Sequence, residues 1–376
     1  MNKVTGFTAL ALAAAAFAGT AQAQSGVTLA GRVDVGPQYI DDGTNKLKRI
    51  DSGTYTASRL IFRGTEDLGD GLKAGFYLEN RFNADVGAQQ SAKFFNAGAQ
   101  VYLSSPTWGS VTLGRQYVPI FWSFLFADDT GPLRLHGYSA VQSVQRSAFA
   151  RVSAAAAPVK AAGSLDTIGG GVYQFGITSA FEDNMVVYKT PSLGGATVML
   201  AAGASEGAPA GSGRVLGANV EYRGGPFYGS LAWNQKRGTV PAGGSGAYQT
   251  ATEALVSGMY TVTPTIKLWG NYHPWKLDTT TADFKGHDWM LGASYYFSQS
   301  MVWLNYAAKT PDNCVACKSR GFGLGYHYFM SRRTELYASI AEVRNDANSG
   351  NALNGFAPAV IGDNVRGVAV GIAHTF

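Results

Sequence analysis

The end of the chain, Asn364 to Phe376, reads Asn-Val-Arg-Gly-Val-Ala-Val-Gly-Ile-Ala-His-Thr-Phe. Side chains of a β-strand alternate between two faces. Val368, Val370 and Ile372 therefore share one face, while glycine and alanine occupy the other. The segment ends on an aromatic residue without a polar tail. This pattern predicts either a last strand that pairs with the first strand and closes a barrel, or a buried last strand of a soluble sheet.

The composition favours a strand-rich protein whose surface does not face water everywhere. The 376 residues include 48 Gly, 19 Tyr and 20 Phe, and only 15% of them are charged, whereas a soluble domain has about a quarter. The net charge is +5, but basic runs are absent. We therefore expect no nucleic-acid partner.

The first residues predict an export signal. Lys3 supplies a positive start, Ala9 to Ala18 an apolar run, and Ala21-Gln22-Ala23 a small-x-small cleavage site. The alternative, an N-terminal membrane helix, needs about 20 apolar residues, and this run is shorter. We expect Met1 to Ala23 to be removed and residues 24–376 to form one domain.

Three early segments, Val27 to Ile40, Ser58 to Thr65 and Leu72 to Phe82, alternate apolar with charged residues. In a soluble sandwich the charged face is outside, whereas in an outer-membrane barrel it lines a wet lumen. The length of these strands, about ten residues, is what a tilted strand needs to cross a membrane. The basic residues on the charged face are Arg32, Arg59, Arg63, Lys73 and Arg81.

The strand pattern continues to the end of the chain and predicts about sixteen strands, an even number as single-chain bacterial barrels require. Short connections alternate with long ones, which is the asymmetry of an outer-membrane barrel. We therefore expect an all-β fold, a transmembrane antiparallel β-barrel. The long connections are Asp41–Ala57, Asn83–Asn96, Val118–Phe181, Ala204–Gly213, Arg237–Ala251, Lys276–Gly286, Thr310–Ser319 and Asn345–Asp363. The aromatic residues that we expect in girdles at the membrane surfaces are Phe76, Tyr222, Phe227, Trp233, Tyr295, Phe297 and Tyr326.

Several stretches, spread from the first strand to the last, resemble the Gram-negative general porins of the neisserial and other beta-proteobacterial type. The matching stretches are Leu29-Ala30-Gly31-Arg32-Val33-Asp34, Ser58-Arg59, Arg63-Gly64-Thr65-Glu66-Asp67-Leu68-Gly69, Val111-Thr112-Leu113-Gly114-Arg115-Gln116 and His374-Thr375-Phe376. Together they cover the whole mature chain.

The resemblance implies a sixteen-stranded homotrimer in the bacterial outer membrane, without enzymatic activity. Small hydrophilic solutes and ions would cross its water-filled lumen by passive diffusion, and no cofactor is implied. The third long loop, Val118 to Phe181, would fold into the pore and narrow it. The last strand, ending on Phe376, would be read by the outer-membrane assembly machinery. This third loop looks longer than is usual for the family and opens with the apolar run Ile120 to Phe126.

Charged residues suggest how such a pore would select ions, because rings of charge set selectivity. We expect the basic residues of the first three strands to form a ladder on one wall, opposite Asp128 and Asp129 of the third loop. Arg115 resembles a family pore arginine, but alternation points it outward unless a bulge intervenes. The third loop also carries basic residues such as Arg134, so we expect weak anion preference. The alternative is that these charges are solvated away from the narrowest point.

Two cysteines, Cys314 and Cys317, lie in a long loop and predict a disulfide that tightens it. The five histidines show no metal-ligand spacing, so we expect no metal. One alternative function is a substrate-selective outer-membrane channel, in which the run Ile120 to Phe126 forms a slide or plug. A barrel enzyme or a secreted β-sandwich lectin belongs to a different class.

Overall fold

The computed structural model describes residues 26–129, 180–204, 213–237, 250–278, 283–312, 314–354 and 356–376. The predicted signal peptide lies outside these residues, as does most of the third long loop. In the described part of the chain, no helix is long and apolar enough to cross a membrane.

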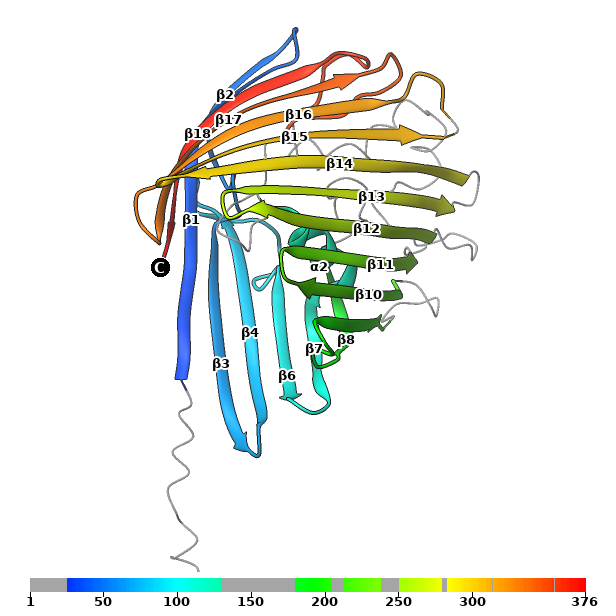
Figure 1. Cartoon of the computed structure of the whole chain (residues 1–376). Coiled ribbons are helices and arrows are strands. Elements are labelled where there is room, and N and C mark those ends of the chain that lie inside the picture. Colours follow the sequence, from blue (N-terminus) through cyan, green and yellow to red (C-terminus); the bar gives the residue numbers. More distant parts are fainter. Residues whose placement is uncertain are drawn as a thin grey trace, which may run out of the picture.

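The described strands form one antiparallel sheet that closes on itself (Figure 1). The elements are β1 (Gly26–Asp41), β2 (Lys46–Ser52), β3 (Arg59–Gly69), β4 (Leu72–Asn83), β5 (Ala88–Gln89), β6 (Gly98–Ser105), β7 (Gly109–Tyr117), α2 (Pro119–Phe126), β8 (Phe181–Lys189), β9 (Ala196–Gly203), β10 (Val215–Gly224), β11 (Phe227–Arg237), β12 (Thr250–Thr263), β13 (Ile266–Asp278), β14 (Asp283–Phe297), β15 (Ser300–Pro311), β16 (Ser319–Phe329), β17 (Thr334–Asn345) and β18 (Val365–Thr375).

The last strand closes the barrel against the first. β18 pairs with β17 on one side and with β1 on the other. Beyond β18, Phe376 and Gly31 exchange both backbone hydrogen bonds, each 3.0 Å long. β2 and β3 pair with successive halves of β1, and the two-residue β5 is an extension beside β4. The result is the predicted closed antiparallel barrel of sixteen strands.

The first two long connections are partly strand, contrary to the sequence prediction. β2 and β5 lie inside segments that we expected to be loops. The prediction missed β2 because its charged sequence lacks a buried face and its pairing depends on the adjacent backbone of β1. The segment between β2 and β3, residues 53–58, leaves the sheet. Asp34 holds it by accepting the backbone N–H groups of Tyr55 and Thr56 at 3.1 and 2.6 Å.

The outer face of the barrel is an exposed apolar belt. On β18, Val368, Val370 and Ile372 are 44–48% exposed, whereas Ala369 and Ala373 are at most 5% exposed. This is the apolar-out alternation of a strand that faces lipid. Of the expected girdle residues, Phe76 is partly buried, and those at least 38% exposed are Tyr222, Phe227, Trp233, Tyr295, Phe297 and Tyr326.

The third long connection begins as a helix, α2, which lies inside the barrel (Figure 1). Pro119 occupies its first turn, where its missing N–H is not needed. A helix of eight residues is not stable alone, so packing must hold it. Ile120, Phe121, Phe124 and Leu125 are at most 2% exposed, in a cluster with side chains of the inner wall.

Candidate pore constriction

A buried carboxylate, Glu79 on β4, organises one part of the inner wall. Its Oε1 atom accepts a hydrogen bond from Arg81 Nε at 2.9 Å and lies 3.6 Å from Arg59 Nη1. Its Oε2 atom accepts the hydroxyl of Tyr77 at 2.6 Å and that of Tyr117 at 3.2 Å. The Glu79 carboxylate is therefore shared by the guanidinium groups of Arg59 and Arg81, two residues that are only 4% and 6% exposed.

Further contacts fix the two guanidinium groups. Arg59 Nε donates to the Ala57 carbonyl at 3.1 Å, and its Nη2 donates to Thr56 Oγ1, both in the segment that leaves the sheet. Arg81 Nη2 donates to the Tyr117 hydroxyl at 2.6 Å, and the Arg81 guanidinium lies 4.8 Å from the Phe181 ring centroid. Residues at both ends of the third loop therefore contact Arg81.

The basic residues of the first three strands share the inner face, as the alternation predicted. Arg81 is the register partner of Arg59, and Arg59 is the register partner of Arg32. Residues paired directly across strands point to the same side of a sheet. Arg63 and Lys73 follow at even spacing on the same face, and both are exposed. Neither forms an ion pair within the described residues.

The acidic residues expected across the pore are engaged with the wall. Asp129 Oδ1 pairs with Lys267 Nζ at 2.7 Å, and its Oδ2 accepts the hydroxyls of Ser294 and Tyr296 at 2.6 and 2.7 Å. Asp128 and Asp129 are both 0% exposed. Sequence reasoning found these residues but not Lys267, because nothing in the local sequence links β13 to this loop.

A register shift does occur beside Arg115, between Gly114 and Gln116 on β7. Arg115 Nη1 pairs with Asp183 at 2.7 Å, and its Nε donates to the Asn96 carbonyl at 2.7 Å. The Arg115 guanidinium also lies 5.6 Å from the Phe181 ring centroid, so Arg115 and Arg81 share that ring. Arg134 lies outside the described residues.

Polar contacts anchor α2 on the opposite wall. The Ser123 hydroxyl accepts hydrogen bonds from Asn219 Nδ2 at 3.0 Å and from the Ser230 hydroxyl at 2.6 Å. Asn219 Nδ2 also donates to the Pro119 carbonyl at 3.0 Å, and Ser257 donates to the Ser123 carbonyl at 2.8 Å. The start of the third loop is therefore fixed to β10, β11 and β12.

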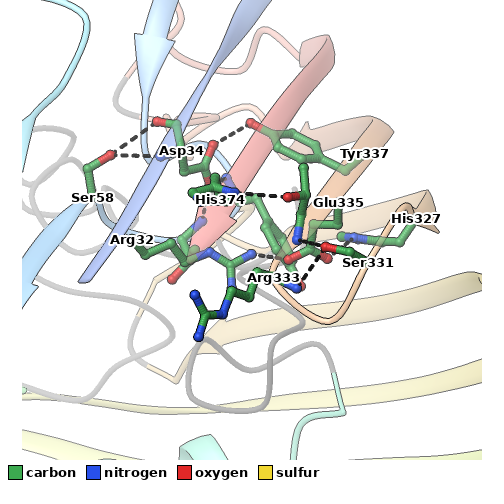
Figure 2. A network of polar contacts seen from close by, with 12 residues as sticks. Arg32, Asp34, Ser58, His327, Ser331, Arg333, Glu335, Tyr337 and His374 are labelled. Carbon is green, nitrogen blue, oxygen red and sulfur yellow. Dashed lines mark hydrogen bonds and ion pairs between the residues drawn. The ribbon is translucent and has the colours of Figure 1, made fainter. Parts of the chain in front are cut away.

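A second charged network joins the first strand to β17 (Figure 2). Arg32 on β1 pairs with Glu335 on β17, and Glu335 also contacts His327 Nδ1 at 3.3 Å. Tyr337 on β17 donates to Asp34 Oδ1 on β1 at 2.7 Å. Both links pass over β18, whose inner face carries glycine and alanine. At Gly371, a Cβ atom would collide with the Tyr337 hydroxyl.

The loop after β1 and the loop between β17 and β18 also contact each other, beyond the strand pairing. Asp42, just after β1, accepts the backbone N–H of Ala359 at 2.6 Å and that of Thr44 at 2.9 Å. Burial of the Asp42 carboxyl favours its neutral form, but backbone donors from Asn45, Ala359 and Thr44 outweigh burial and hold its pKa below the usual value.

Cys314 and Cys317 form a disulfide in the structure, with Cα atoms 5.6 Å apart. They lie in the connection between β15 and β16, where the sequence placed them. Within the described ranges, no group of three or more His, Cys, Asp or Glu residues could hold a metal ion.

The protein thus has a lipid-type outer face, a charged inner wall and a helix, α2, packed against that wall, which together define an outer-membrane channel. Residues 9–348 match the family model for Gram-negative porins. Outer membrane porin protein 32 of Delftia acidovorans is 32% identical, covering 98% of this chain and 99% of that protein. An outer membrane porin protein of Bordetella pertussis is 28% identical, and the match covers 96% of this chain and 97% of that protein.

Among solved structures, the anion-selective porin from Comamonas acidovorans superposes with a TM-score of 0.76 at 29% identity, covering 94% of this chain and all of that one. The chain belongs to the Gram-negative porin family. It is an outer-membrane porin, a passive channel and not an enzyme.

Proposed function

We propose that this porin prefers small hydrophilic anions weakly, and that the inner wall of β1, β3 and β4 carries the preference. The observation behind this proposal is the charge count at Glu79, where one carboxylate faces the two guanidinium groups of Arg59 and Arg81. One positive charge therefore remains. Exposed Arg63 and Lys73 add two more on the same face, and Asp67, the register partner of Lys73, offsets one of them.

The neighbouring charged groups supply little to oppose this excess. Asp129 is neutralised by Lys267, Glu335 by Arg32, and Glu182 by Lys236. Charges in a confined site attract counter-ions over about a Debye length, roughly 8 Å at physiological salt. We therefore expect the preference to be stronger at low salt. The anion selectivity stated for the Comamonas acidovorans porin agrees with this direction.

The test is the reversal potential of the reconstituted protein in a salt gradient. Arg59→Gln combined with Arg63→Gln leaves Glu79 paired with Arg81, so it removes positive charge without leaving a bare carboxylate. We expect this variant to lose most of the anion preference. Arg320→Gln with Arg344→Gln is the matched control. It removes the same charge from the outer face, where both arginines are ion-paired.

Two outcomes would contradict the proposal. One is a wild-type channel that selects cations. The other is an equal loss of preference in the test and control variants, which would mean that net charge and not the inner wall decides.

The substrate-selective alternative receives no support from α2. Its apolar side chains are buried against the wall and bonded through Ser123, so most of the run Ile120 to Phe126 does not offer an exposed slide. Block of the current by one solute class at low concentration would revive that alternative.

We further propose that the protein assembles as a homotrimer and that its last strand is recognised by the outer-membrane assembly machinery. OmpT of Vibrio cholerae, which shares the fold at 14% identity, has been solved in a trimer form. Three conductance steps that appear and close together in one insertion event support a trimer, and solitary steps argue against it.

A further inference from the structure

A cavity of about 540 Å³ lies at the end of the barrel where the short turns are. Its lining includes Tyr296, Phe329, Arg332, Arg333 and Thr375. The size falls within the range of pockets that bind small molecules, roughly 300–1,000 Å³. Short turns face the periplasm in barrels of this type. The cavity therefore lies at the periplasmic end of the barrel, opposite the end that carries the long loops.

The cavity has an excess of positive charge. Arg332 and Arg333 are exposed, and neither forms an ion pair within the part of the chain that the structure describes. Glu335, which also lines the cavity, is engaged by Arg32 and His327. The terminal carboxylate of Phe376, which is nearby, offsets one positive charge, and one of its oxygens accepts the Gly31 N–H at 3.0 Å.

Two aromatic rings lie beside these guanidinium groups. Tyr296 is held by its hydroxyl, which donates to Asp129 at 2.7 Å, and Lys267 Nζ is 4.8 Å from its ring centroid. Phe329 stacks on the His327 ring with centroids 6.3 Å apart. Both rings are thus positioned by neighbours on the inner wall. They give the cavity flat apolar surfaces next to two unpaired cations.

The cavity also adjoins the row of basic residues on the inner wall. Arg32 is the register partner of Thr375, and the Thr375 N–H donates to the Arg333 carbonyl at 2.7 Å. Arg333, the residue just before β17, therefore extends this row into the turn. Figure 2 places it near Arg32 and Glu335.

We propose that this cavity binds aromatic carboxylates at the periplasmic mouth. A carboxylate accepts hydrogen bonds from a guanidinium in a bidentate geometry, and an aromatic ring packs on the ring faces of Tyr296 and Phe329. The two features together select a flat anion over a small hydrated one. This proposal goes beyond weak anion preference, because it concerns binding at the mouth and not selection at Glu79.

The test uses the full-length porin in a planar bilayer, with benzoate as the probe and acetate as the matched anion without a ring. Each is added to either side while chloride current through single channels is measured. We expect benzoate to reduce the current in a saturable way from one side, at a concentration at least tenfold lower than acetate.

Two variants assign the effect to the cavity. Arg332→Gln with Arg333→Gln should weaken the benzoate block about tenfold or more, because hydrogen bonds between a guanidinium and a carboxylate are stronger than those between neutral groups. Phe329→Leu should raise the blocking concentration of benzoate until it is close to that of acetate. Arg344→Gln is the control, because Arg344 lies at the other end of β17 and pairs with Glu342. It should leave the block unchanged.

Equal block by benzoate and acetate overturns the aromatic specificity. Block that survives in the double arginine variant overturns the site. Reversal potentials recorded on the same channels report the preference at Glu79 separately, so either proposal can fail without the other.

Discussion

The Glu79 site and the Arg32–Glu335 network contain the same kinds of side chain but differ in balance and in sequence separation. At Glu79, one carboxylate meets two guanidinium groups from neighbouring strands. At the barrel seam, Arg32 and Glu335 are 303 residues apart and pair one to one, across the strand that closes the barrel. A balanced, long-range pair ties the fold together, whereas an unbalanced, local cluster leaves charge that can act on ions.

The largest effect should come from breaking the seam at its end. Deleting Phe376 removes both backbone hydrogen bonds to Gly31 and the ring that covers Gly31. We expect the truncated protein to be exported but to reach the outer membrane at a small fraction of the normal level. Heat-modifiable migration on a gel measures the folded barrel. Normal amounts of folded protein would contradict the importance of this contact, and Phe376→Tyr, which keeps the ring, serves as the control.

The second largest effect should come from the Arg32–Glu335 pair at the seam, and a double-mutant cycle measures its contribution to the free energy of unfolding. Glu335→Gln alone should cost about 3–5 kcal/mol, because it leaves Arg32 buried beside an uncharged partner. Adding Arg32→Gln should recover most of that loss, because a buried pair removed as a whole is often nearly neutral. Urea or thermal unfolding in detergent measures both.

The double variant of the Arg32–Glu335 pair also tests whether the seam network, like the Glu79 site, affects ion selectivity. Arg32→Gln with Glu335→Gln does not change the net charge, so we expect its reversal potential to match the wild type. Arg59→Gln with Arg63→Gln should change that potential. A large shift in the seam variant would show that Arg32 also selects ions, and the distinction between the two regions would then be wrong.

The smallest effect should come from the loop disulfide. Cys314 and Cys317 close a short loop between β15 and β16, outside the strand pairing. We expect mass spectrometry of the mature protein to find them oxidised. Cys314→Ser with Cys317→Ser should change barrel stability by less than the seam variants, because a short closed loop constrains the unfolded chain little. Two free thiols after non-reducing isolation would rule out the bond.

Strand alternation allowed much of the barrel to be predicted. The period of two in β1, β3 and β4 placed Arg32, Arg59 and Arg81 on one face, and the structure pairs them directly. The alternation of short and long connections predicted a barrel, because it reflects the two different sides of a membrane. Pro119 before an apolar run was a signal for α2 that the sequence reasoning did not use.

The sequence by itself determined the strands other than β2 and β5, the closing role of β18 and the sign of the charges on the inner wall, because these depend on local spacing. Only the tertiary structure decided which charges are balanced. Lys267 neutralises Asp129 from β13, and Glu335 neutralises Arg32 from the far end of the chain. The inward fold of residues 53–58 likewise depends on Asp34, which lies on another strand. Such pairings arise when the barrel closes, and closure brings together residues that no sequence window contains.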